Sequence, residues 1–170
     1  MTDKSQVGDN RRRKDAIVSI DEKLTSLGLT LPAPPKPVAS YVPAILVGDL
    51  LYLSGMLPFR DGQVVITGKL GQEVTVERGA EAARLALLNA LAVVKQELGS
   101  LDRVRRIVRV VGHVASATGF AQQPAVINGA SDLLVEIFGE AGRHARVALG
   151  AAELPLHAAI ELELLVQVRV

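Results

Sequence analysis

A segment near the C-terminus combines one arginine with small residues in a pattern suited to binding a carboxylate. Arg146 is followed at alternate positions by Ala148 and Gly150. Because alternate side chains of a strand lie on the same face, this spacing predicts a hollow floored by backbone, with a guanidinium at its rim. A guanidinium presents a planar pair of donors that matches the two oxygens of a carboxylate. The pattern therefore predicts a site for a small carboxylate.

Two glutamates on the next segment offer the second half of such a site. Glu161 and Glu163 alternate with an uninterrupted apolar series: Ile160, Leu162, Leu164, Val166 and Val168. We expect a hairpin that turns near Pro155 to bring the small residues opposite one of these carboxylates, which would then orient a water. The alternative is a purely structural ion pair between Arg146 and a glutamate, on a sheet face covered by solvent or by another subunit.

The same alternation predicts which side of each strand faces the core. The apolar series of the last segment is expected to lie against helices, and Val147 and Leu149 of the preceding segment are expected to do the same. Arg146, Ala148 and Gly150 would then lie on the opposite face, together with the glutamates.

Other reactive residue types are absent or scattered. The chain contains no cysteine, which excludes a disulfide scaffold and a thiol nucleophile. The histidines, His113, His144 and His157, lack the spacing of metal ligands. His144 lies two residues before Arg146 and is a candidate for lining the same site. No serine occupies a nucleophile elbow, so covalent acyl chemistry has no support, and no glycine-rich phosphate loop occurs.

Local signals predict the elements that position these residues. A capping box at Ser19 opens a short helix, and Thr75 opens a long helix that Gly99 ends. Pro124 suits the first turn of a third helix. Apolar runs predict strands at 44–47, 50–54, 64–67, 104–114, 147–152 and 159–168. This order predicts an α+β sandwich, with two helices on one face of a largely antiparallel sheet.

The composition narrows the class of function. Of 170 residues 49% are hydrophobic, but only two tyrosines and three phenylalanines are aromatic. So few rings and a net charge of +1 argue against a nucleic-acid partner. No apolar run approaches the ~20 residues that a membrane-spanning helix needs. We expect a soluble, cytoplasmic protein in which residues 19–170 form one domain, behind a disordered basic tail at 1–18 that contains the run Arg11–Lys14.

Several longer motifs resemble one known family. They are YVPA at 41–44, GDLLYLSG at 48–55, and ARVALGAAELP at 145–155 followed by IELE at 160–163. These motifs resemble the RidA/YjgF family of reactive intermediate deaminases, which are often labelled L-PSP endoribonucleases. The segment from Gln123 to Arg146 and the proline-rich segment before residue 41 are similar to its larger bacterial subfamily.

The resemblance implies a chorismate-mutase-like α+β fold and a homotrimer whose sheets form a central barrel. It also implies ligand sites in the clefts between subunits. Arg146 matches the family arginine that binds the substrate carboxylate, and Glu161 matches the acidic residue that positions the hydrolytic water. Tyr41, Gly55 and Asn128 match other substrate-binding positions of the cleft.

One position departs from the family pattern. Ala148 stands where the family commonly has a cysteine, which acts mainly through its backbone groups. The resemblance thus implies hydrolysis of reactive 2-imino or 2-enamino acids to 2-keto acids and ammonia, without a cofactor, because the imine is already activated. One alternative is a trimer that binds a small carboxylate without catalysis. An endoribonuclease is a less favoured alternative, because RNA binding needs a basic surface. The net charge of the chain is only +1, and its sequence predicts no basic groove.

Overall fold

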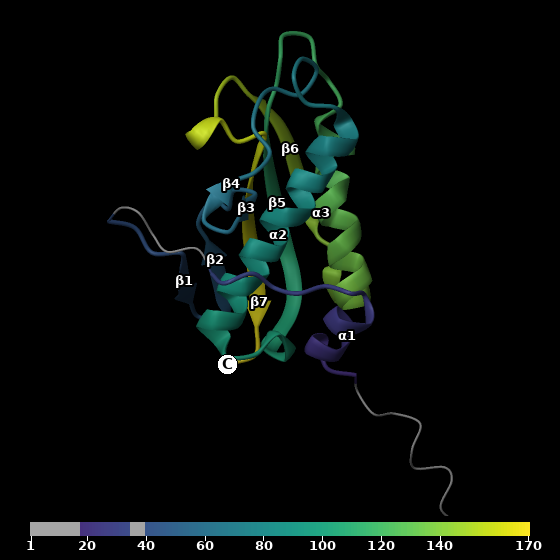
Figure 1. Cartoon of the computed structure of the whole chain (residues 1–170). Coiled ribbons are helices and arrows are strands. Elements are labelled where there is room, and N and C mark those ends of the chain that lie inside the picture. Colours follow the sequence, from purple (N-terminus) through teal and green to yellow (C-terminus); the bar gives the residue numbers. More distant parts are fainter. Residues whose placement is uncertain (1–17, 35–39) are drawn as a thin grey trace, which may run out of the picture.

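A five-stranded sheet with the order β1-β2-β7-β5-β6 forms one layer of the molecule (Figure 1). The computed structural model describes residues 18–34 and 40–170, and the predicted basic tail lies outside them except for Val18. Two short strands form a separate hairpin in place of the single strand predicted at 64–67. The strands are β1 (Ala44–Val47), β2 (Leu50–Leu53), β3 (Phe59–Arg60), β4 (Gln63–Val64), β5 (Val104–Ala115), β6 (Ala145–Ala151) and β7 (Ile160–Val168).

Two helices lie side by side on one face of this sheet (Figure 1). They are α2 (Val76–Leu98) and α3 (Gln123–Phe138), and the shorter α1 (Ile20–Ser26) packs against α3. The predicted α+β sandwich is therefore confirmed. Within the described part of the chain, no helix is long and apolar enough to cross a membrane.

The helix ends lie where local signals predicted them. Ser19 and Glu22 form a capping box at α1. The hydroxyl of Thr75 accepts a hydrogen bond from the backbone N–H of Arg78 at 3.3 Å, which caps the start of α2. Gly99 ends that helix in the left-handed conformation, with a φ of 78°. Local capping thus sets the start of α1 and both ends of α2.

The core between helices and sheet is aliphatic and closely packed. Its β7 side chains are all 3% exposed or less: Ile160, Leu162, Leu164, Val166 and Val168. At Gly112 of β5, the Ile127 side chain of α3 occupies the space that a Cβ atom would need. This close approach of α3 to β5 also brings α3 within reach of the neighbouring strand β6.

The position of β6 differs from the prediction. β6 pairs in parallel with one edge of β5, and β7 pairs with the other edge, so the expected hairpin between the last two strands is wrong. Val110 pairs with both Arg146 and Leu164. Arg146 therefore lies on the helix-covered face, and Ala148 and Gly150 follow it there. The opposite prediction was wrong because a period of two tells which residues share a face but not which face is covered.

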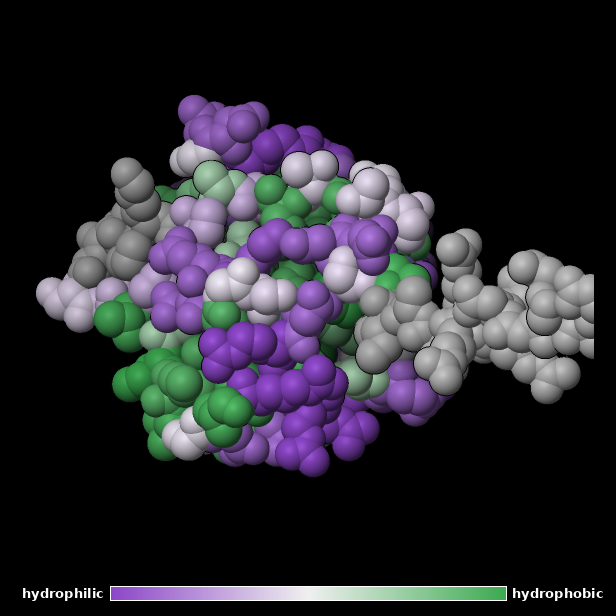
Figure 2. Space-filling view, turned by 90° about the horizontal axis from the view of Figure 1, so that it is seen from below, coloured by the Kyte–Doolittle hydropathy of each residue, from purple (hydrophilic) through white to green (hydrophobic). Residues whose placement is uncertain are grey.

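The other face of the sheet is not covered by any described helix and is partly apolar. Val147 and Leu149 lie on this open face rather than in the core. Ile45, Val47, Tyr52 and Leu149 are each between 44% and 59% exposed. Figure 2 shows hydrophobic side chains gathered on the side where β1 and β2 lie, next to a strongly hydrophilic area. Such an apolar surface is typical of a contact with another protein chain.

Candidate functional site

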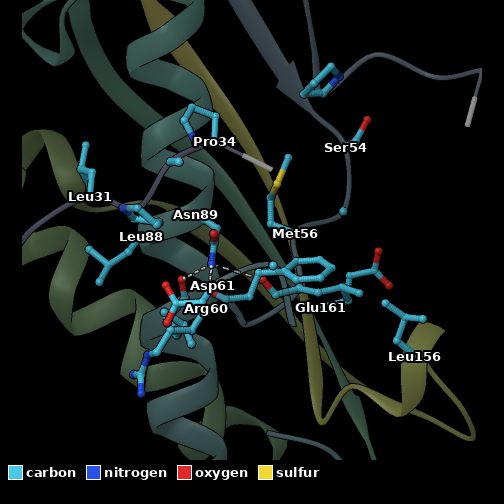
Figure 3. A pocket seen from close by; sticks show the side chains of 18 of the residues that line it. Leu31, Pro34, Ser54, Met56, Arg60, Asp61, Leu88, Asn89, Leu156 and Glu161 are labelled. Atoms are coloured by element: carbon cyan, nitrogen blue, oxygen red, sulfur yellow. Dashed lines mark hydrogen bonds between the residues drawn. The ribbon is translucent and has the colours of Figure 1, made fainter. Parts of the chain in front are cut away.

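Three of the predicted site residues, Tyr41, Gly55 and Glu161, line one large cavity (Figure 3). Its volume is about 1230 Å³. Figure 3 shows Glu161 and Leu156 on one side of the cavity and Leu31 and Leu88 on the other. Most of the remaining wall is apolar and includes Pro32, Ala33, Pro34, Pro43, Met56, Leu57, Phe59, Leu85 and Pro155. The cavity therefore places the carboxyl group of Glu161 beside an apolar wall, and Arg60 and Asp61 are the other charged residues that line it.

The carboxyl group of Glu161 lies directly over Gly55. A Cβ atom at position 55 would overlap Glu161 Oε1, so a larger residue fits only if the glutamate moves. The backbone fixes this contact, because Met56 exchanges two hydrogen bonds with Leu162 at 2.7 and 2.9 Å. The loop after β2 is thus held against β7, and Gly55 is the residue that this approach requires.

The surroundings of Glu161 raise its pKa above the usual range of a glutamate. Burial is the largest cause, because it disfavours the charged form; His113 lowers the pKa and Glu163 raises it further. His113 Nε2 itself lies 2.8 Å from Glu163 Oε1. A carboxyl group with a raised pKa exchanges protons with water more readily near neutral pH, which suits it to acid–base chemistry.

A buried asparagine shapes another part of the cavity wall. Asn89 of α2 is 1% exposed, and its side-chain nitrogen donates to the carbonyl oxygens of Phe59 at 2.9 Å and Leu85 at 3.0 Å. The first of these bonds ties the loop around β3 to α2. Sequence reasoning did not assign Asn89 to a site. The available signal was a polar residue inside the apolar run 85–94.

Arg146 and Asn128, two further predicted site residues, lie together at the edge of the sheet. Arg146 Nη1 donates to Asn128 Oδ1 at 2.7 Å and to Ser131 Oγ at 3.1 Å. The two acceptors are one turn apart on α3, so both reach the same nitrogen. No described residue accepts a hydrogen bond from Nε or Nη2. The guanidinium is thus anchored through one nitrogen, and its Nε–Nη2 edge is free to bind a carboxylate.

Arg146 does not form an ion pair with any acidic residue that the structure describes. The ion pairs among those residues are Lys69–Glu153, Arg78–Glu81, Lys95–Asp21, His113–Glu163 and Arg143–Glu140. A structural pair between Arg146 and a glutamate, the alternative left open by the sequence, is therefore not present within residues 18–34 and 40–170. The sixth predicted residue, Ala148, follows Arg146 on the same face and packs against the core.

One chain does not bring Arg146 and Glu161 together. Glu161 pairs with His113 of β5, whereas Arg146 pairs with Val110 of the same strand. Val110 and His113 are three residues apart on β5, so their side chains lie on opposite faces of the sheet, and those of Arg146 and Glu161 do the same. In addition, β5 lies between the strands β6 and β7 that carry them. The six predicted site residues therefore fall into two groups, which we call half-sites: Tyr41, Gly55 and Glu161 in one, Arg146, Asn128 and Ala148 in the other.

Two of the three histidines lie beside the half-sites, whereas His157 lines a separate small pocket with Lys69 and Glu153. His113 lies on the open face beside the glutamates, whereas His144 Nε2 lies 3.0 Å from Ser131 Oγ and so joins the Arg146 cluster. Sequence reasoning missed Ser131, although its position three residues after Asn128 on one helix was an available signal. Among the residues described, no group of three histidine, aspartate or glutamate side chains is arranged to hold a metal ion.

Comparison with known proteins gives consistent matches along the chain. Residues 21–168 match the family described as "YjgF/chorismate_mutase-like, putative endoribonuclease". Protein TCP17 of Trypanosoma cruzi is 44% identical over 145 residues, which cover 85% of this chain and 91% of that protein. Atu1372 of Agrobacterium tumefaciens, a protein of unknown function, is 43% identical with a TM-score of 0.83, over 89% of this chain and 94% of its own. A "putative endoribonuclease" from Shewanella oneidensis is 37% identical with a TM-score of 0.86, over 88% of this chain and 99% of its own.

Proposed function

The chain belongs to the RidA/YjgF family, and on this premise we propose that it hydrolyses reactive 2-imino and 2-enamino acids to 2-keto acids and ammonia. The observation that carries the proposal is that Asn128 and Ser131 hold Nη1 of Arg146 while its Nε–Nη2 edge donates to none of the residues that the structure describes. Such an edge binds the carboxylate that every substrate of this class carries. Glu161, whose pKa is raised by burial, supplies the group that exchanges protons with water.

The proposed reaction divides the work between the two half-sites. Arg146 binds the substrate carboxylate and so fixes the position of the imine carbon. Glu161 accepts a proton from a water whose oxygen adds to that carbon and passes this proton to the imine nitrogen, which gives a carbinolamine. The Glu161 carboxylate then accepts the hydroxyl proton of the carbinolamine and delivers it to the amino nitrogen. The C–N bond breaks as the carbonyl forms, and ammonia leaves. A 2-enamino acid first tautomerises to the imine.

The proposal includes a homotrimer with sites between its copies. Arg146 and Glu161 leave opposite faces of one chain, so a complete site needs Arg146 from one copy and Glu161 from another. The exposed apolar residues of the open face support self-association. Arg106 and Arg109 of β5 lie on the same face as Glu161 and Glu163, and their charges complement the glutamates of a second copy.

The test is turnover of an imine generated in solution. We expect the protein to accelerate keto-acid release from 2-iminopropionate, formed in situ by an amino-acid oxidase, and expect Arg146→Ala and Glu161→Gln each to abolish the acceleration. The matched controls are Arg143→Ala and Glu153→Gln, which remove exposed charges that pair only with Glu140 and Lys69. Release no faster than in buffer would reject the proposed hydrolysis.

A second candidate function is binding of a small carboxylate without catalysis. The observation that favours it is that Asn128 and Ser131 hold the Arg146 guanidinium within one chain, independent of Glu161. This function predicts stabilisation by pyruvate that Arg146→Ala removes and Glu161→Gln leaves unchanged, with no turnover. Measuring melting temperature and turnover on the same variants separates the two functions.

A further inference from the structure

A chain of hydrogen bonds leads from the backbone to Arg146 through His144, which the sequence offered only as a residue lining the site, and Ser131, to which the sequence assigned no role. His144 Nδ1 lies 2.6 Å from the carbonyl oxygen of Gly142, and His144 Nε2 lies 3.0 Å from Ser131 Oγ. Ser131 Oγ in turn accepts from Arg146 Nη1 at 3.1 Å. Four groups are therefore connected in sequence, and the last of them is the guanidinium of the anion-binding half-site.

With the imidazole of His144 neutral, the chemistry of the groups fixes the direction of every bond. A carbonyl oxygen only accepts, so His144 carries its proton on Nδ1. In a neutral imidazole Nε2 is then an acceptor, and the Ser131 hydroxyl donates to it. The hydroxyl hydrogen consequently points away from Arg146 and leaves an oxygen lone pair for Nη1. Without His144 the hydroxyl hydrogen of Ser131 could rotate towards the guanidinium. Its O–H group would then face an N–H group of Arg146, and neither could accept a hydrogen bond from the other.

The local fold holds the chain of bonds in one arrangement. Ser131 follows Asn128 by one turn of α3, so the two acceptors flank Arg146 Nη1. The 3₁₀ turn Gly139–Gly142 brings the Gly142 carbonyl to His144, and a Cβ atom at position 142 would overlap the backbone oxygen of Leu134. The carbonyl that orients the histidine is thus set by backbone packing rather than by a mobile side chain.

We propose that Ser131 and His144 are positioning residues, which orient the Arg146 guanidinium so that its Nε–Nη2 edge meets the ligand carboxylate. The inference rests on the proposed function only in taking Arg146 as the carboxylate-binding group. Asn128 alone anchors Nη1 at one point and leaves the guanidinium plane able to turn. The second bond, from Nη1 to Ser131, fixes the plane.

Pyruvate binding, measured by calorimetric titration, tests the proposal without requiring turnover. We expect Ser131→Ala and His144→Phe to weaken pyruvate binding about three- to tenfold, the range for loss of one hydrogen bond. His144→Gln should bind almost as the unmodified protein does, because its side-chain oxygen can occupy the position of Nε2 and accept from Ser131. Ser26→Ala, which alters a serine on α1 bonded only to the carbonyl of Lys23, is the matched control.

Two further measurements separate positioning from a structural role. In an Arg146→Lys background, Ser131→Ala should cause no further loss of pyruvate affinity, because the effect acts through the guanidinium. Nitrogen NMR of the unmodified protein should show the Nδ1–H tautomer of His144. Observation of the Nε2–H tautomer, or wild-type pyruvate affinity in Ser131→Ala with only a lower melting temperature, would overturn the proposal. Intact pyruvate binding in Arg146→Ala would reject the proposed function itself, because Arg146 would then not bind the carboxylate. That result differs from the two results above, which reject only the positioning role of Ser131 and His144.

Discussion

The guanidinium of Arg146 is anchored by an amide and a hydroxyl of α3, and no described acid competes for its remaining nitrogens. A neutral anchor keeps the full positive charge available to an incoming anion. An acidic partner would have to be displaced before the arginine could bind a carboxylate. This choice of anchor is the one that the proposed carboxylate-binding role of Arg146 requires.

This geometry makes the shape of residue 146 as important as its charge. Arg146→Lys keeps the charge but loses the planar edge, and we expect pyruvate affinity to fall about 10- to 150-fold, or roughly 1.5–3 kcal/mol. Arg146→Glu should abolish binding, because two carboxylates would meet. Calorimetric titration and melting temperature are measured together. Unchanged affinity in Arg146→Lys with a large drop in melting temperature would assign the arginine to the fold instead.

Glu161 should make stability depend on pH in a defined direction. Burial raises its pKa in the folded state above that in the unfolded chain, so its favourable contribution is complete below the unfolded pKa and is lost as pH rises through the folded pKa. Glu161→Gln has no charge to bury. At pH 7 we expect this variant to unfold at a higher urea concentration than the unmodified protein. Near pH 4 the glutamate is protonated, so the difference in stability between the two proteins should vanish. A gain of equal size at both pH values would contradict this origin.

At the scale of the elements, the approach of the loop after β2 to β7 depends on the missing side chain of Gly55. Gly55→Ala forces the Glu161 carboxyl group out of its place, and we expect a loss of roughly 1–3 kcal/mol in the free energy of unfolding. In a Glu161→Ala background the same change should cost much less, because the overlapping atoms are gone. Urea unfolding of the four proteins checks this coupling. Equal losses in both backgrounds would show that the two residues do not compete for space.

The elements that sequence predicted best are those with local causes. The helix ends at Ser19, Thr75 and Gly99 depend on caps within a few residues, and the structure confirms them. The covered face of β7 was also predicted correctly, because five alternating apolar residues leave no other choice.

The face of β6 was predicted wrongly because its cause is not local. Val147 and Leu149 look like core residues, but α3 connects β5 to β6, and a strand–helix–strand connection places its strands in parallel. That signal was present in the predicted order of elements. The division of the site into two halves follows from this topology, so no motif within one segment could have revealed it. Ser131 shares a helix turn with Asn128, but its contact with Arg146 depends on which strand lies beneath α3, and the predicted hairpin concealed this.

At the scale of the whole molecule, the open face of the sheet should bury its apolar side chains in an assembly. We expect the 18.0 kDa chain to behave as a trimer in light scattering at micromolar concentration. Leu149→Asp, which places a charge on this face, should shift the population towards monomer. Val135→Asp is the matched control, because Val135 is an exposed apolar residue, 37% accessible, on α3. A monomeric mass for the unmodified chain would contradict the assembly.

The placement of Arg146 and Glu161 on opposite faces has a consequence for mixed assemblies. If each site takes its arginine from one copy and its glutamate from the next, an Arg146→Ala chain and a Glu161→Gln chain are each inactive alone yet complement one another. In a mixed cyclic trimer, one interface then joins an intact arginine to an intact glutamate, while another joins the two defective residues. Random mixing of equal amounts should therefore restore about one quarter of the unmodified activity, since about three quarters of cyclic trimers are mixed and each has one good site of three. Two inactive proteins that remain inactive after being unfolded and refolded together would place both residues of a site in the same copy.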